Sequence, residues 1–211
     1  MTAAQTIVVA CLGDSITAGN PGWDPDPARR QIEDPGDDER SQYLYWAATR
    51  DTRLELRNFG VGGERTDQIA ARLVEAADGA DVLVIQGGIN DIVEGRSSRE
   101  AARDLRAMVR RANDGGLAVA LAEVLPWNGG WPGAAPEIKA LNETIALIGR
   151  EASVPVLPFY ATLEDPDRPG RMRADWTADG SHPSVEGHRR LGEIAFRLPP
   201  GWGPGESRAT A

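Results

Sequence analysis

The sequence is poor in cysteine, histidine and lysine, and each shortage excludes a class of protein. The chain of 211 residues has one cysteine, Cys11, which permits neither an internal disulfide nor a cysteine-based zinc site. Its two histidines, His182 and His188, are too few for an all-histidine metal centre. Its one lysine, Lys139, lies outside any Walker motif. Disulfide-rich scaffolds, zinc sites of these types and P-loop nucleotide binding are therefore excluded.

Excess positive charge and long apolar segments are absent as well. The chain carries 23 basic and 32 acidic residues, a net charge of −9 at pH 7. Because a net acidic protein repels phosphate backbones, we do not expect a nucleic-acid partner. The apolar stretch 7–12 is too short to span a bilayer, and it lacks the basic start and cleavage site of a signal peptide. We expect a cytoplasmic protein without stable membrane insertion.

Length and composition indicate one globular domain. At about 150 residues per domain, this chain length favours one domain over two. A hydrophobic share of 41% and a charged share of 26% are typical of globular proteins. The predicted domain covers residues 1–198. Within it, the acidic and proline-containing segment 20–40 predicts an insertion or lid, and segment 199–211 predicts a flexible tail.

Strand and helix patterns alternate along this domain. Short apolar runs predict five strands, at residues 6–12, 53–59, 81–86, 117–124 and 154–159. Amphipathic stretches predict helices at 66–77, 99–113, 137–151 and 184–197, with Thr66 and Ser184 as N-caps. This alternation predicts an α/β fold, a three-layer sandwich with a five-stranded parallel sheet of flavodoxin-like order. Ligands of such sheets bind at the carboxyl ends of the strands.

Residues that can carry chemistry follow three of the predicted strands. Gly-Asp-Ser at 13–15 would aim a serine hydroxyl into the cleft, although this tripeptide is also ordinary turn chemistry. The glycine-rich turn 58–66 could bind an oxyanion through its N–H groups or simply reverse the chain; a dinucleotide fingerprint would need glycine in place of Arg65. Asn90 could donate its amide to a developing negative charge or cap a turn.

The segment before the last predicted helix holds an acid–base pair. Asp179 and His182 are close enough in sequence for the carboxylate to accept a hydrogen bond from Nδ1 of the imidazole, which leaves Nε2 as a general base. An isolated Asp-x-x-His is otherwise a structural feature. We expect His188, in the helix that follows, to be partly exposed. Asp14 and Asp91 are predicted to anchor loops through backbone N–H groups.

Taken in order, these segments resemble the GDSL/SGNH hydrolase family from about residue 6 to residue 196. Four family blocks match, at residues 13–17, 58–66, 88–91 and 179–183. The resemblance implies a serine esterase with Ser15 as the nucleophile and His182 and Asp179 as the other members of a catalytic triad. It also implies an oxyanion hole formed by Ser15, Gly63 and Asn90. The ordinary α/β-hydrolase elbow is excluded, because it needs glycine where Thr17 stands.

The resemblance implies ester hydrolysis through an acyl-enzyme, without a metal or cofactor. The substrate would be a small-molecule ester, and we expect short acyl groups such as O-acetyl groups on a carbohydrate. Of six tryptophans, Trp46 is predicted to lie in the core, and four lie in loops predicted at the rim of the site: Trp23, Trp127, Trp131 and Trp176. Indole faces there could stack on sugar rings or acyl chains, or could only cover the edge of the core.

Three alternatives remain open. A lysophospholipase or thioesterase would use the same residues on longer acyl chains, although the negative net charge argues against adsorption to an anionic membrane. An acyltransferase would pass the acyl group to an acceptor other than water. A non-catalytic α/β protein would bind a small anion through the glycine-rich turn and Asn90.

Overall fold

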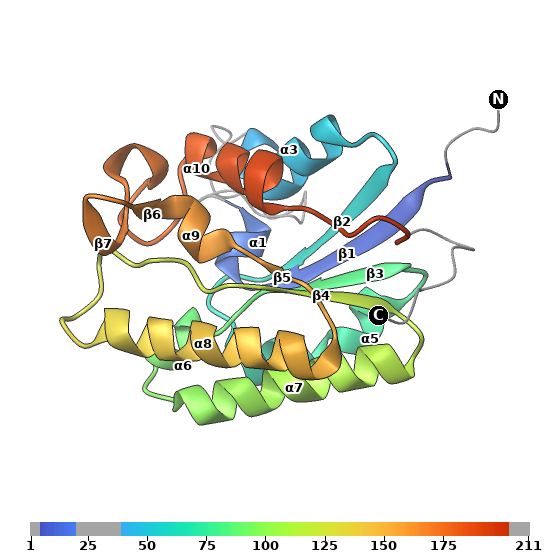
Figure 1. Cartoon of the computed structure of the whole chain (residues 1–211), viewed down its shortest axis with the longest axis horizontal. Helices are drawn as coiled ribbons and strands as arrows, with labels where there is room; N and C mark the ends of the chain where they lie inside the picture. Colours follow the sequence, from blue (N-terminus) through green and yellow to red (C-terminus); the bar gives the residue numbers. More distant parts are fainter. Residues whose placement is uncertain (1–4, 20–38, 203–211) are drawn as a thin grey trace.

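A five-stranded parallel sheet forms the centre of the fold, in the predicted order β2-β1-β3-β4-β5 (Figure 1). The computed structural model describes residues 5–19 and 39–202. The strands are β1 Ile7–Gly13, β2 Leu54–Gly60, β3 Val82–Ile85, β4 Ala118–Ala122 and β5 Val156–Leu157. All five predicted strands are present. β5 is shorter than predicted because Pro155 and Pro158 enclose it, and proline cannot donate to a strand ladder.

The central strands are buried on both faces because they consist almost entirely of apolar residues. Every residue of β3 and β4 is buried, and in β1 only Val8 is half-buried. The edge strand β2 is different, since it carries exposed Glu55 and half-buried Arg57. Alternate side chains of the central strands enter two separate hydrophobic cores, one on each face of the sheet.

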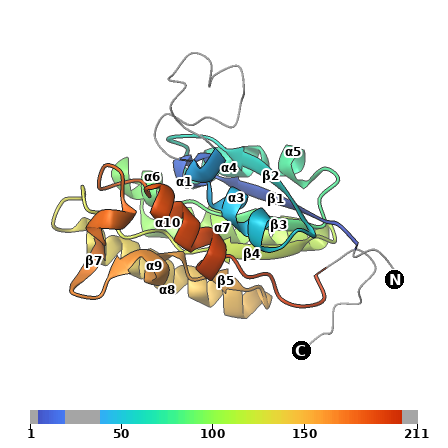
Figure 2. The same ribbon diagram turned by 90° about the horizontal axis from the view of Figure 1, so that it is seen from above.

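Helices cover both faces, which gives the predicted three-layer sandwich (Figure 1, Figure 2). The first core lies under α4 Thr66–Ala71, α5 Leu73–Ala77, α6 Ile89–Val93, α7 Ser98–Asp114 and α8 Ala134–Ala152. The second lies under α1 Ser15–Ala18, α3 Tyr43–Arg50, α9 Phe159–Leu163, α10 Val185–Arg190 and the π-helical η3 Leu191–Ala195. The remaining elements are η1 Glu39–Ser41, η2 Ala174–Trp176 and an antiparallel pair, β6 Glu164–Asp165 and β7 Arg168–Met172.

The first predicted helix differs from expectation in two respects. It is broken at Arg72 into α4 and α5, and its N-cap is Arg65, so the prediction that Thr66 is the cap is wrong. Thr66 instead donates its hydroxyl to buried Asp91 at 2.8 Å, a tertiary contact that takes the side chain away from the helix end. The predicted Ser184 cap of α10 is confirmed, because its Oγ accepts a hydrogen bond from the third helical N–H.

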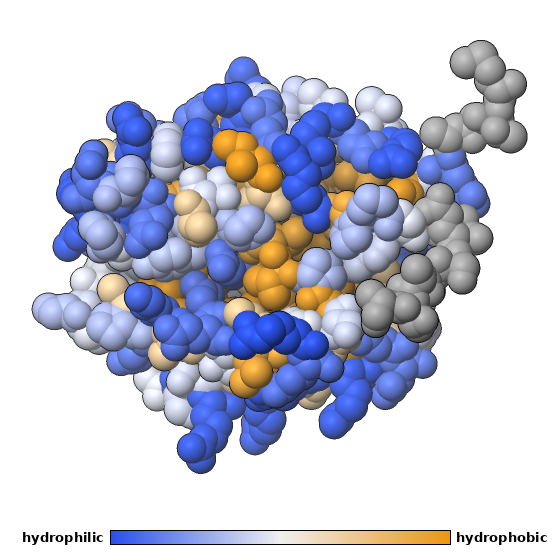
Figure 3. Space-filling view, viewed as in Figure 1, coloured by the Kyte–Doolittle hydropathy of each residue, from blue (hydrophilic) through white to orange (hydrophobic). Residues whose placement is uncertain are grey.

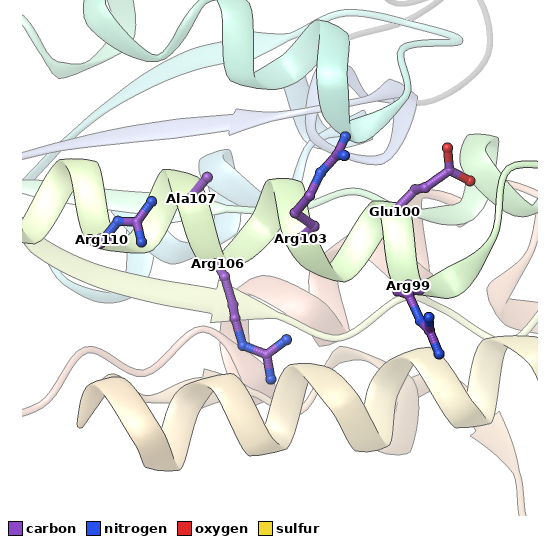
Figure 4. Close-up of a pocket in the computed structure, with 6 residues that line it drawn as sticks. All are labelled: Arg99, Glu100, Arg103, Arg106, Ala107 and Arg110. Carbon is purple, nitrogen blue, oxygen red and sulfur yellow. The ribbon is translucent and has the colours of Figure 1, made fainter.

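The helix α7 separates apolar from basic side chains. Its inner face buries the predicted stripe, which includes Leu105, Met108 and Val109. Its outer face carries a shallow groove lined by Arg99, Glu100, Arg103, Arg106, Ala107 and Arg110 (Figure 4). Arg106 reaches across to Glu151 of α8. The outer face of α7 is therefore a local basic strip on an acidic protein.

The surface seen in Figure 3 is largely hydrophilic, with apolar side chains gathered between the two helix layers where β5 lies in Figure 1. Trp202 packs, partly buried, against the second core. The rest of the predicted tail, residues 203–211, lies outside the described residues, as do residues 20–38 of the predicted insertion. Within residues 5–19 and 39–202, no helix is long and apolar enough to cross a membrane.

Close packing holds α1 against the end of β2. A Cβ atom on Gly60 would lie 2.0 Å from the backbone nitrogen of Ala18, so only glycine fits there. Asn58 Nδ2 donates to the carbonyl oxygens of Thr17 at 2.9 Å and Ala18 at 3.2 Å, while its Oδ1 accepts from the Gly60 N–H at 2.8 Å. Ser15, the first residue of α1, is therefore fixed relative to the sheet.

The N-cap of α1 is a completely buried carboxylic acid, Asp14. Its Oδ1 accepts a hydrogen bond from the Ile16 N–H at 2.9 Å. Burial raises the pKa of Asp14 from 3.8 to about 6, although hydrogen bonds with Ile16 and Gln86 and the nearby His182 lower it in part. The native state binds this proton more tightly than the unfolded chain does. The stabilisation of the folded state by this proton is complete below pH 3.8 and is lost as the pH rises through about 6.

We predict that Asp14→Asn raises the free energy of unfolding at pH 8, because asparagine keeps the cap acceptor and has no charge to bury. A pKa raised from 3.8 to about 6 corresponds to about 3 kcal/mol. We expect a gain of that size in urea unfolding at pH 8, shrinking towards zero near pH 4. Asp91→Asn is the matched control: this buried carboxylate pairs with Arg96, so its loss should destabilise the protein. An Asp14→Asn variant no more stable than wild type at pH 8 would contradict the prediction.

Candidate active site

The predicted nucleophile Ser15 lies at the carboxyl end of β1, as the first residue of α1. The strand ends at Gly13, Asp14 caps the helix, and the serine follows directly. Ser15 is half-buried, whereas the other three residues of α1 are buried. The short helix thus presents one polar side chain outward and uses the rest to hold itself on the sheet.

Ser15, His182 and Asp179 form a continuous hydrogen-bonded chain. Ser15 Oγ lies 3.0 Å from His182 Nε2. On the other side of the ring, His182 Nδ1 lies 2.8 Å from Asp179 Oδ2. In this arrangement the carboxylate accepts from Nδ1–H, and Nε2 is left to accept the serine proton. The structure therefore brings together the three residues of the predicted triad.

Asp179 is held in its ionised form by hydrogen-bond donors, and its side chain is 45% exposed. Partial desolvation acts to raise its pKa. Hydrogen bonds from the His182 ring, the His182 N–H and the Ser181 N–H outweigh this effect and keep the pKa of Asp179 below its ordinary value. A carboxylate that stays charged can orient the imidazole and stabilise it when it becomes protonated.

The turn that carries the pair is tied together by Thr177, which sequence reasoning did not identify. Thr177 Oγ1 donates to the His182 carbonyl at 2.8 Å and accepts from the Gly180 N–H at 2.9 Å. Gly180 adopts φ of +86°, a conformation that favours glycine. The Thr-x-x-Gly spacing was visible in the sequence, but nothing distinguished it from an ordinary turn.

A second loop supports this turn from outside. Trp127 Nε1 donates to Ser181 Oγ at 2.8 Å, one residue before the catalytic histidine candidate. The neighbouring Asn128 donates its backbone N–H to the Gly180 carbonyl at 2.7 Å and exchanges two side-chain hydrogen bonds with the backbone of Met172. The loop after β4 is thus attached to the loop that carries Asp179 and His182.

The other two predicted oxyanion donors lie in the loop after β2, which carries Gly63, and in the first turn of α6, which carries Asn90. Gly63 is exposed and has φ of +80°. A Cβ atom on Gly62 would lie 3.9 Å from Ser15 Cβ, so this loop passes beside the nucleophile. Asn90 Nδ2 donates to the Glu64 carbonyl at 2.9 Å, which uses one of its two N–H groups and leaves the other.

The two flanking acids have the predicted structural roles. Asp14 accepts from the Ile16 N–H, as described above. Asp91 is completely buried and accepts from the backbone N–H of Thr66 at 2.8 Å, and it also pairs with Arg96. The predicted anchoring of loops through backbone N–H groups is therefore confirmed for both residues.

The prediction for His188 is wrong. Its imidazole is completely buried rather than partly exposed, because α10 is packed among α3, α9, η1 and η2. Burial lowers the pKa of His188 to about 3, with a smaller contribution from His182, so the ring is neutral. Within residues 5–19 and 39–202, no group of three or more His, Cys, Asp or Glu side chains could hold a metal ion.

The predicted rim tryptophans differ in exposure. Trp131 is 41% exposed and makes an edge-to-face contact with Trp127, at 5.5 Å between ring centroids. Trp176 does not present an open face, since the Arg190 guanidinium lies 3.9 Å from its ring centroid and the indole packs against the second core. Trp23 lies outside the described residues. Trp46, predicted in the core, is half-buried.

Solved structures with the same fold include several lipolytic proteins. A member of the lipolytic protein G-D-S-L family from Veillonella parvula has a TM-score of 0.74 at 20% identity, covering 92% of this chain and 100% of that one. A GDSL-like lipase from Bacteroides thetaiotaomicron gives 0.68 at 21% identity, with 88% and 83% covered. A variant of an acetyl xylan esterase from Geobacillus stearothermophilus gives 0.68 at 18% identity, with 94% and 99% covered.

No curated protein sequence matches the chain. A family model does, and its match includes the end of the strand that leads to Ser15, the loop of Gly63, the helix of Asn90, and the turn of Asp179 and His182. Because the model described as the GDSL-like Lipase/Acylhydrolase family covers residues 11–190, the chain belongs to that family and is a carboxylic ester hydrolase.

Proposed function

We propose that this chain is a serine esterase that removes short acyl groups, O-acetyl groups above all, from a carbohydrate alcohol through an acyl-enzyme. The observation that carries the proposal is the hydrogen-bonded chain from Ser15 Oγ to His182 Nε2 and from His182 Nδ1 to Asp179 Oδ2, at 3.0 and 2.8 Å. These separations suit proton transfer without further movement of the backbone.

In the first half of the reaction, Ser15 Oγ forms a bond to the ester carbonyl carbon while its proton passes to His182 Nε2. The carbonyl π electrons move onto oxygen, and Asp179 stabilises the imidazolium. The oxyanion would lie among the N–H groups of Ser15 and Gly63 and the remaining N–H of Asn90. Each such donor lowers a barrier of this kind by about 3–4 kcal/mol.

The tetrahedral intermediate then collapses. The bond to the leaving alcohol breaks, and His182 Nε2 returns its proton to that oxygen, which leaves an acyl ester on Ser15. Water enters, gives its proton to His182 and attacks the same carbonyl carbon. Collapse of the second intermediate releases the carboxylic acid and returns the proton to Ser15 Oγ.

Two features favour a carbohydrate as the leaving alcohol. His182 must deliver a proton to the departing oxygen, so the alcohol leaves on the side of this residue. Next to it, Ser181 is bonded to Trp127, and Trp127 contacts the exposed indole of Trp131. An exposed indole suits stacking on a sugar ring. The acetyl xylan esterase with the same fold is consistent with this substrate class.

We predict that Ser15→Ala abolishes ester hydrolysis and labelling by a fluorophosphonate probe. The alanine side chain has no oxygen to acylate or phosphonylate, and it removes no backbone contact. In-gel fluorescence and a p-nitrophenyl acetate assay measure the two effects. Ser184→Ala is the control, since this serine caps α10 and donates to the Asp175 carbonyl without a hydrogen bond to the triad, and its loss should leave labelling unchanged. Wild-type turnover in Ser15→Ala would refute Ser15 as the nucleophile, whereas neither turnover nor labelling in the wild-type protein would favour a non-catalytic anion-binding role.

We predict that Asn90→Ala lowers kcat by about 100-fold or more while KM changes little. The donor acts on charge that exists only in the transition state, so ground-state binding does not depend on it. Steady-state kinetics with p-nitrophenyl acetate separate the two parameters. An equal kcat in variant and wild type would exclude Asn90 from the oxyanion hole.

We predict that Trp131→Ala raises KM for acetylated xylo-oligosaccharides several-fold, through loss of a stacking face worth about 1 kcal/mol, and leaves KM for ethyl acetate unchanged. Trp46→Phe is the control variant, because the Trp46 indole bonds the Arg40 carbonyl and does not contact Trp127 or Trp131.

A parallel series of p-nitrophenyl esters tests acyl length. Higher kcat/KM for long chains than for acetate would instead favour the lysophospholipase or thioesterase function.

A further inference from the structure

Arg72 occupies the break between α4 and α5, and its side chain enters the protein beneath the candidate active site. The residue serves as both C-cap of α4 and N-cap of α5, with φ of −95° and ψ of 3°. Its side chain is only 21% exposed. Within the described residues, its side-chain hydrogen bonds go to Gly13, Phe59 and Glu64, which lie on segments that carry site residues but are not site residues themselves.

Two of these contacts are with strand ends. Arg72 Nη1 donates to the Phe59 carbonyl of β2 at 2.9 Å, and Nη2 donates to the Gly13 carbonyl of β1 at 3.2 Å. Gly13 is the last residue of β1 and precedes the cap of α1. One guanidinium therefore joins the two points where the chain leaves the sheet towards Ser15 and towards Gly63.

A third contact is with Glu64, the residue after Gly63. Arg72 Nε lies 3.0 Å from Glu64 Oε2 and 3.2 Å from Oε1, and Nη2 also contacts Oε2. The Glu64 side chain is 16% exposed, so the ion pair is largely removed from water. Charge-assisted bonds of this kind are the strong ones in proteins, and their two-point geometry fixes orientation.

The Glu64 backbone extends this connection to Asn90. Its carbonyl oxygen accepts the hydrogen bond from Asn90 Nδ2 at 2.9 Å. Glu64 is thus held by Arg72 through its side chain, and it holds the Asn90 amide through its backbone. Each of the three oxyanion donors assigned under the proposed function belongs to a segment that contacts Arg72 directly or through Glu64.

Only a planar guanidinium can make this set of contacts. Arginine presents five N–H donors in a rigid fork, whereas a lysine ammonium is a single point with three donors. The charge of Arg72 is largely compensated by Glu64. We therefore expect Arg72 to affect the oxyanion through the positions of its donors rather than through the electrostatic field of the guanidinium. A displacement of about 1 Å at a catalytic group can cost about 100-fold in rate.

We propose, on the basis of the proposed function, that Arg72 is a positioning residue that sets the spacing of the oxyanion donors by joining the ends of β1 and β2 to the Glu64–Asn90 link. Its contribution appears in the transition state. The ester carbonyl of the bound substrate carries little charge, so substrate binding depends only weakly on the spacing of the oxyanion donors. Loss of Arg72 should therefore lower kcat and spare KM.

The test compares Arg72→Ala and Arg72→Lys with Arg57→Ala in p-nitrophenyl acetate hydrolysis. Arg57 is a matched control, since it lies on β2, pairs with Glu55 and donates to the Asp78 carbonyl. We expect kcat to fall about 100-fold in Arg72→Ala and about 10-fold in Arg72→Lys, with KM within about three-fold of wild type. Arg57→Ala should keep wild-type kinetics.

A double-mutant cycle distinguishes positioning from loss of fold. If Arg72 acts through the Glu64–Asn90 link, its removal should cost far less in an Asn90→Ala background than in wild type, so the two losses do not multiply. A merely structural role would give the same factor in both backgrounds. Urea unfolding of each variant accompanies the kinetics, and Arg72→Lys carries the test if Arg72→Ala does not fold.

The outcomes separate this proposal from the proposed function. Hydrolysis that persists in Ser15→Ala refutes the function, and with it the role of Arg72. If Ser15→Ala is inactive, the role of Arg72 is overturned by wild-type kcat in Arg72→Lys, by multiplicative losses in the cycle, or by a change confined to KM. A kcat effect that diminishes in the Asn90→Ala background supports it.

Discussion

The hydrogen bond between Ser15 Oγ and His182 Nε2 joins residues 167 positions apart, and the function of the protein depends on it. Neither residue can find the other locally. The contact exists because parallel strands direct all their following loops to one edge of the sheet. The first strand places the serine at that edge, and the turn before α10 returns the imidazole to it. The sheet therefore acts as the reference frame for the chemistry.

The frame is made rigid by polar contacts in places that would be simpler to fill with apolar groups. Asp14 is buried, which raises its pKa, and the Asn58 amide holds α1 against β2 and also bonds Gln42. Asp91 and Arg96 form a further largely buried pair behind the Asn90 helix. Such groups contribute little net stability, but each has a single satisfactory geometry. They restrict the site to one arrangement of its loops.

Much of this could be predicted from the sequence. Continuous apolar runs identified the strands, and their alternation with amphipathic stretches identified the order of the sheet. The site residues were predicted because each stands in a short motif at the end of an element. What could not be predicted depends on partners distant in sequence. Thr66 was predicted to be a cap but bonds Asp91, and His188 was predicted to be partly exposed but is completely buried. The supporting contacts of Thr177, Trp127 and Arg72 have no local signature.

The two edge strands of the sheet have a consequence for aggregation at high protein concentration. An unpaired strand is a template for pairing with another chain, and long flat borders invite aggregation. Here β5 has only two ladder residues between Pro155 and Pro158, and the outer strand β2 carries Glu55 and Arg57. Neither edge strand presents an uninterrupted run of apolar side chains along its unpaired backbone donors and acceptors. The molecule can thus keep a fully parallel, strongly apolar sheet without turning it into a nucleus for fibrils.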